Sequence, residues 1–148
     1  MSSTSRATDQ NLQMSKRYYH TINICFGSII LGIFLYSLLF RGDNHPIPAL
    51  LTQLTGVIPP SKGLSASFSE IVRLNFDAAN QLNHYGLRIF SFFMIQLFTR
   101  AFVSLAVENG RIKTSRIVTI DAIFSAALFA FCFAPLIGYT VYLFAKLF

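Results

Sequence analysis

Residues 59–107 read PPSKGLSASFSEIVRLNFDAANQLNHYGLRIFSFFMIQLFTRAFVSLAV. After the proline–proline break, the segment Leu64–Leu82 places apolar side chains on one helical face and polar side chains on the others. This pattern predicts an amphipathic helix that lies on a membrane surface or over the end of a bundle. From Tyr85 to Val107 most residues are apolar. Because about 20 helical residues cross the roughly 30 Å of hydrocarbon in a bilayer, this second part predicts a membrane span.

Two further apolar blocks flank that stretch, Thr21–Phe40 before it and Ile117–Phe144 after it. Apolar residues make up 53% of the chain and charged residues only 12%, about half the charged share of soluble proteins. The sequence therefore predicts an all-α integral membrane protein with three transmembrane helices, over about residues 21–40, 85–107 and 117–144. An amphipathic, interfacial helical cap over residues 49–82 is expected between the first and second spans.

The residues before the first span form a polar tail, 1–20, that ends in the basic and aromatic collar Lys16–His20, and such collars are typical of membrane interfaces. We expect the tail to be mobile or laid on a partner, and the membrane domain to cover 21–148. A cleaved signal peptide is the alternative for the first apolar block. Against it, the block is too long and Leu39–Asp43 is not a small-residue cleavage site.

Basic residues cluster in the N-terminal segment and in the short connection between the second and third spans: Arg6, Lys16, Arg17, Arg111, Lys113 and Arg116. Under the positive-inside rule, this clustering predicts a cytoplasmic N-terminus. The expected location is a bacterial inner membrane or a membrane derived from it, with an organellar inner membrane as the alternative. The net charge of +6 reflects basic residues at the ends of the apolar blocks, where they mark the topology of the spans. No basic stripe is interleaved with base-stacking side chains, so nucleic acid is not an expected partner.

Three charged residues lie inside the predicted spans: Arg88, Arg100 and Asp121. Arg88 is close enough to one end of its span for its side chain to reach the membrane interface, whereas Arg100 and Asp121 lie deeper. Antiparallel packing of the second and third spans would place them at similar depths, and a lone charge there is costly, so they are expected to pair. The alternative is that Asp121 faces water near the start of its helix, where the helix dipole favours a negative charge. In the cap, Arg73 and Asp77 are four residues apart and are expected to pair on the wet face.

The third span carries a small residue at every fourth position: Ala122, Ala126, Ala130, Ala134 and Gly138. Lipid does not drive helices together by the hydrophobic effect, so close backbone approach through small residues matters more there. We interpret this small-residue stripe as a helix-packing seam. Ser28 and Gly32 form a shorter pair of the same kind in the first span.

No catalytic, cofactor-binding or metal-binding residues are predicted. Cys25 and Cys132 lie within apolar blocks, and His45 and His84 are interpreted as interfacial residues rather than ligands. We therefore expect no cofactor, although a bound lipid or pigment stays open.

A set of residues in the cap and at the start of the second span occurs in a recognisable order and spacing: Pro60, Gly63, Leu64, Phe68, Phe76, Ala78, Ala79, Leu82, Asn83 and Gly86. By the order and spacing of these residues, the segment Val57–Arg100 resembles the DUF2752 family of small bacterial membrane proteins. The family's two cap cysteines stand here as Pro59 and Lys62, and its cap arginine as Ala66. The resemblance implies the scaffold and a bacterial origin, with the thiol and arginine chemistry of that cap lost.

We therefore expect a non-catalytic accessory or structural subunit that packs by its transmembrane helices within a larger membrane protein complex, for which an energy-transducing assembly is one host. Its partners would be other membrane protein subunits and the lipid bilayer. One alternative is a self-contained membrane enzyme or carrier that uses Arg100, Asp121 and His84. Another is a small membrane immunity or regulatory protein.

Overall fold

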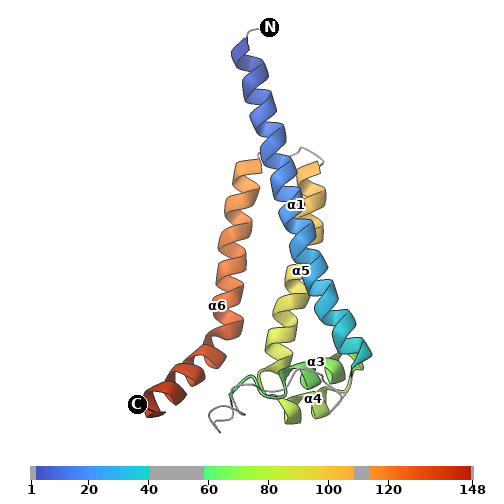
Figure 1. Ribbon diagram of the computed structural model, residues 1–148, viewed down its shortest axis with the longest axis vertical. Helices are drawn as coiled ribbons and strands as arrows, with labels where there is room; N and C mark the ends of the chain where they lie inside the picture. The colour runs from blue at the N-terminus through green and yellow to red at the C-terminus, as the bar shows by residue number, and fades with distance from the viewer. Residues whose placement is uncertain (1–2, 41–58, 109–113, 148) are drawn as a thin grey trace.

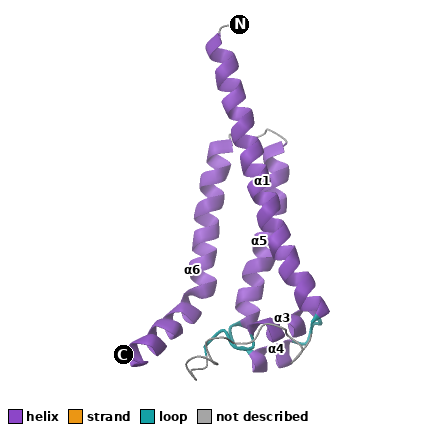
Figure 2. Ribbon diagram, viewed as in Figure 1, coloured by secondary structure: helices purple, strands orange, loops and turns teal. Residues whose placement is uncertain are grey.

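The computed structural model describes residues 3–40, 59–108 and 114–147. Within these ranges the chain forms helices α1 (Ser3–Leu39), α3 (Leu64–Val72), α4 (Phe76–Leu82), α5 (Gly86–Glu108) and α6 (Thr114–Leu147). The described residues contain no strand (Figure 2). The part of the predicted cap over residues 49–57 lies outside the described residues.

Three of these helices are long and apolar enough to cross a membrane, over Gln13–Leu39, Gly86–Val107 and Ser115–Leu143. The predicted fold class, an all-α protein with three membrane spans, is confirmed. Figure 1 shows α5 between α1 and α6 at one end of the bundle, α3 and α4 beneath it, and the two chain termini at opposite ends. Helix α1 packs against α5, and α5 packs against α6.

The predicted polar tail is not a separate segment, because α1 begins at Ser3 and continues without a break into the first span. That the tail is mobile or laid on a partner stays a prediction, and its helical conformation has a simple reason. No proline or glycine occurs before Gly27, and once a span supplies the nucleus a helix propagates through ordinary polar residues at little cost.

The predicted amphipathic helix Leu64–Leu82 is two helices, α3 and α4, that meet at a sharp turn. At this turn Leu74 has a left-handed backbone conformation, with φ of 64°. The N–H groups of Arg73 and Asn75 both donate to the carbonyl of Glu70, which closes α3, and the side chain of Asn75 donates to Glu70 Oε2 at 3.1 Å. The helical periodicity of the apolar residues could not reveal this break, because the same spacing continues from α3 into α4.

A small apolar core joins the cap to the spans. The buried residues Phe68, Ile71, Ala79 and Ile89 form one cluster, and the ring of Phe68 meets the ring of Phe90 edge-on with centroids 5.3 Å apart. Because edge-to-face pairs add to the gain from area burial, the contact fixes α3 across the end of α5.

Close backbone approach and one buried amide complete the cap. Gly63 has φ of +77°, and a Cβ there would lie 2.4 Å from the carbonyl oxygen of Leu82. At Gly86 a Cβ would lie only 1.9 Å from Ser67 Oγ, whose hydroxyl donates to the carbonyl of Ala79 at 2.9 Å. Asn83 donates to the carbonyls of Pro60 and Lys62 at 2.9 and 2.8 Å. These residues therefore hold the segment before α3 against the junction of α4 and α5.

Arg73 does not pair with Asp77 as predicted. Its guanidinium donates to the carbonyls of Ser37 and Leu38 at the end of α1, at 3.3 and 2.7 Å, and to that of Ser69 at 2.5 Å. The last carbonyls of a helix have no partner within it and carry the negative end of the dipole. Arg73 therefore gains more by capping α1 than by an exposed ion pair.

Candidate functional site: a polar cluster between three spans

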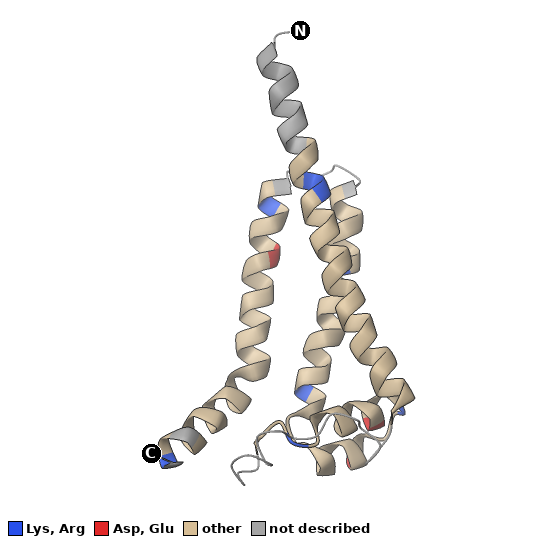
Figure 3. Ribbon diagram, viewed as in Figure 1, with Lys and Arg blue, Asp and Glu red and all other residues tan. Residues whose placement is uncertain are grey.

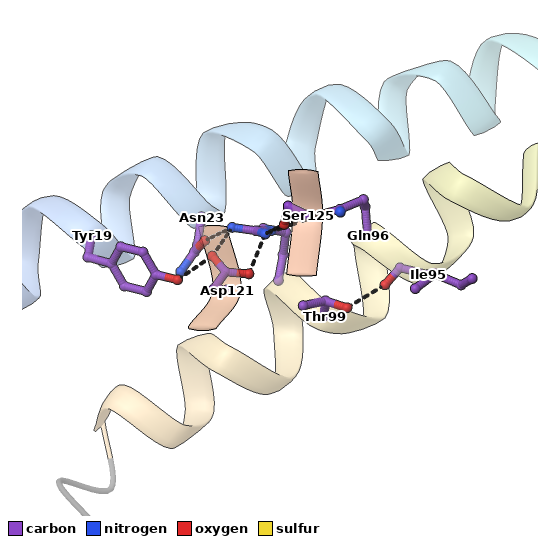
Figure 4. Close-up of polar contacts among 8 residues, drawn as sticks. Tyr19, Asn23, Ile95, Gln96, Thr99, Asp121 and Ser125 are labelled. Carbon is purple, nitrogen blue, oxygen red and sulfur yellow. Dashed lines mark hydrogen bonds and ion pairs between the residues drawn. The ribbon is translucent and has the colours of Figure 1, made fainter. Parts of the chain in front are cut away.

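Each of the three spans contributes two polar side chains, four residues apart, to one buried cluster (Figure 4). The pairs are Tyr19 and Asn23 from α1, Gln96 and Arg100 from α5, and Asp121 and Ser125 from α6. Residues at i and i+4 lie one above the other on the same helical face. Each helix therefore presents its polar pair as one patch, and the three patches meet.

Arg100 is the centre of the cluster. Its guanidinium binds the Asp121 carboxylate in a bidentate manner, with Nη2–Oδ1 at 2.5 Å and Nη1–Oδ2 at 2.7 Å. Three further acceptors complete its environment: Asn23 Oδ1 at 3.0 Å, Gln96 Oε1 at 3.1 Å and Ser125 Oγ at 2.7 Å. The side chains of Arg100 and Asp121 are 12% and 6% exposed. A charge pair this deep is stable only when good geometry and extra hydrogen bonds offset its desolvation, and both are present.

The carboxylate of Asp121 is shared between two helices besides its own. Tyr19 donates its hydroxyl to Asp121 Oδ2 at 2.5 Å, so α1 is tied to α6 directly as well as through Arg100. The cluster thus links α1, α5 and α6 at one depth. Near it, Ser104 Oγ and His20 Nδ1 are 2.5 Å apart, which adds a second polar contact between α5 and α1.

The arrangement favours a structural role over a chemical one. Both oxygens of Asp121 accept hydrogen bonds, so the carboxylate is held in place by α1 and α5. Two buried donors, Asn23 Nδ2 and Gln96 Nε2, make no hydrogen bond with the described residues. Their oxygens are committed to Arg100, so a bound water would find two donors at the edge of the cluster. Over the described ranges no group of three His, Cys, Asp or Glu residues could hold a metal ion.

The structure decides between the two alternatives for Asp121, because the residue is paired with Arg100 rather than turned to water. His84 is not brought to this pair. It precedes the first residue of α5 and contacts Asn80 at 3.1 Å, whereas Arg100 lies roughly 20 Å further along that helix at 1.5 Å per residue. An enzyme or carrier site made of all three residues is therefore not formed.

The small-residue stripe of α6 points away from the bundle. All five members, Ala122 to Gly138, are exposed, whereas Asp121 and Cys132 on the opposite face of the helix are buried. A Cβ at Gly138 would meet no other atom within 4 Å. Ser28 and Gly32 in α1 are exposed as well. Neither set of small residues is buried against the described part of the chain.

A second polar contact joins α5 to α6 at the cap end of the bundle. In a regular helix the carbonyl of Phe131 would accept from the N–H of residue 135, but Pro135 has none. Arg88 fills this gap, since its Nη2 donates to the Phe131 carbonyl at 2.6 Å and its guanidinium lies 4.5 Å from the centre of the Phe131 ring. Helix α6 bends in its C-terminal third (Figure 1), and the contact of Arg88 with the Phe131 carbonyl supports this bend.

Comparison with known proteins finds no match: no family model, no curated protein and no solved structure resembles the chain. The resemblance to the DUF2752 family thus gains no support from this comparison and stays a prediction.

Proposed function

We propose that the protein is a non-catalytic accessory subunit that packs by its transmembrane helices within a larger membrane protein complex. One observation supports this most, namely that the small-residue stripe of α6 is exposed along its whole length. Leu and Phe would serve equally well on a face that meets only lipid, and α6 places such residues elsewhere. Five small residues on one face suit a helix that must be approached closely by another.

The polar cluster fits the same proposal. It locks α1, α5 and α6 together through groups whose charges cancel, and in the described part of the chain it has no free base or nucleophile. The polar cluster fixes the orientation of α6 relative to α1 and α5, and with it the direction in which the outer face of α6 points. It therefore supports a scaffold that offers a rigid docking helix rather than a site for chemistry.

The proposal is tested by purifying the protein in a gentle detergent from its native membranes through a C-terminal tag, with mass spectrometry of the species on a native gel. We expect a stoichiometric larger assembly. The variant Ala130→Leu should lose that assembly, because the added side chain would push a partner helix away from the stripe. Ala101→Leu is the matched control, since Ala101 is likewise an exposed alanine, on α5, and it should retain the assembly. Migration of the unaltered protein as a free monomer would contradict the proposal.

We also propose that the N-terminus is cytoplasmic, in a bacterial inner membrane or a derived membrane. The described part of the chain supports this by its charge distribution (Figure 3). The N-terminal end of the bundle carries the basic residues Lys16, Arg17 and Arg116. At the cap end, the acidic residues Glu70 and Asp77 offset the basic residues. In a cysteine-free background, an impermeant maleimide should label Lys62→Cys in intact cells and Ser15→Cys only after lysis. The reverse pattern would invert the topology.

Membership of the DUF2752 family is likewise a proposal. It is supported by the roles of the residues on which the resemblance rests, because Gly63, Asn83 and Gly86 each make a close contact that shapes the cap. An alignment of homologues that keeps these three residues together would support it, and free variation at all three would count against it.

A further inference from the structure

An open groove of about 490 Å³ lies between α5 and α6 beside the end of α4. This volume is within the range of small-molecule sites. The groove has a polar end and an apolar wall. Asn80 and His84 stand where α4 leads into α5, and Leu87, Ile95 and Leu128 line the part that runs along the spans. Its exposed apolar wall belongs to two transmembrane helices, so the groove opens toward the acyl chains of the bilayer.

Arg88 gives the groove its charge. It lies in the first turns of α5, at the depth where a long basic side chain reaches the headgroup layer. Its partners are the carbonyl and the ring of Phe131, and no described carboxylate forms an ion pair with it. A guanidinium has five N–H donors, and the contact with the Phe131 carbonyl is the one hydrogen bond that Arg88 makes to the described residues. The groove therefore ends in a positive charge that no carboxylate of the described residues compensates.

We propose that this groove binds an anionic phospholipid, with an acyl chain along Leu87, Ile95 and Leu128 and the phosphate at Arg88. The order of polarity in the groove, from Asn80 and His84 to the apolar wall, matches the order from headgroup to tail in a lipid. A transmembrane helix of a partner would fill the apolar part equally well but would have no need of the charge. The charge of Arg88, which no described carboxylate pairs with, thus selects the lipid.

Native mass spectrometry of the full chain, released from an uncharged detergent, tests the proposal. Phosphatidylglycerol and phosphatidylcholine with identical acyl chains are added at equal concentration. A basic residue near anionic headgroups contributes about 1 kcal/mol, which is about fivefold in affinity, so phosphatidylglycerol should bind about fivefold more tightly. Arg88→Gln should abolish this preference, while Arg88→Lys, which keeps the charge, should retain most of it.

Two controls separate the headgroup contact from other effects. Lys62→Gln removes one positive charge from an exposed position at the same end of the molecule and should leave the preference unchanged. Because Arg88 also supports the bend of α6, the affinity for phosphatidylcholine is measured in each variant: with Arg88→Gln it should stay unchanged while that for phosphatidylglycerol falls to the same level, whereas a structural loss of the groove would lower both. Equal binding of the two lipids, a preference that survives Arg88→Gln, or displacement of the lipid by soluble glycerol phosphate at the same concentration would each overturn the proposal.

Discussion

Asp121→Asn should lower the free energy of unfolding by about 3–5 kcal/mol, the usual cost of removing one partner from a buried ion pair. The amide would keep one acceptor for Arg100 but would place an N–H₂ group against the other arm of the guanidinium. The positive charge of Arg100 would then remain 12% exposed with no anion beside it. Unfolding by an anionic detergent in mixed micelles, followed by far-UV circular dichroism, measures the change.

The double variant Arg100→Met with Asp121→Leu is the matched control. Replacing a buried pair with apolar residues of similar size is often neutral or stabilising, so the double variant should recover most of the loss, within about 1–2 kcal/mol of the unaltered protein. The outer members of the cluster should matter less, and Tyr19→Phe should cost about 1.5–3 kcal/mol, as expected for one hydrogen bond to a charged group. If Asp121→Asn changed the free energy of unfolding by less than about 1 kcal/mol, the polar cluster would not be what holds the three spans together.

Gly63→Ala should destabilise the protein by about 2–5 kcal/mol. The left-handed backbone at φ of +77° accounts for about 1–2 kcal/mol with a side chain present. Displacing the Leu82 carbonyl, which a Cβ would approach to 2.4 Å, accounts for about 1–3 kcal/mol more, the usual cost of overpacking. The same micelle titration measures the loss.

The same substitution elsewhere in the chain provides the comparison. Gly27 lies inside α1, and a Cβ there would meet nothing within 4 Å. Alanine is the better helix former by about 1 kcal/mol, so Gly27→Ala should leave the stability unchanged or raise it. Equal effects of Gly63→Ala and Gly27→Ala would show that the cap does not depend on the close approach of Gly63 to Leu82.

The positions of the spans could be predicted because hydropathy is a local property of the sequence. The separation of α3 from α4 could not, since it depends on the left-handed conformation of Leu74, a residue that rarely adopts it. The continuous helix from Ser3 was missed for a related reason, because the polarity of a segment indicates whether it enters lipid and does not indicate whether it is helical.

The polar cluster was predicted in part. The matching depths of Arg100 and Asp121 followed from counting turns along two antiparallel helices. Tyr19, Asn23 and Ser125 were not predicted, because their participation depends on how each helix is rotated about its axis. One signal was present, since each span carries a polar pair at i and i+4, and on three neighbouring helices such pairs indicate a shared face.

Photo-crosslinking from within the membrane tests the central claim, that α6 offers its small-residue stripe to a partner helix. A photoreactive phenylalanine analogue is placed at Ala130, and at Ala101 as the control, in the full chain in its native membrane. We predict one protein adduct of defined mass from Ala130 and only lipid adducts from Ala101. Lipid adducts from both positions would mean that the stripe faces the bilayer, and the accessory-subunit account would then be wrong.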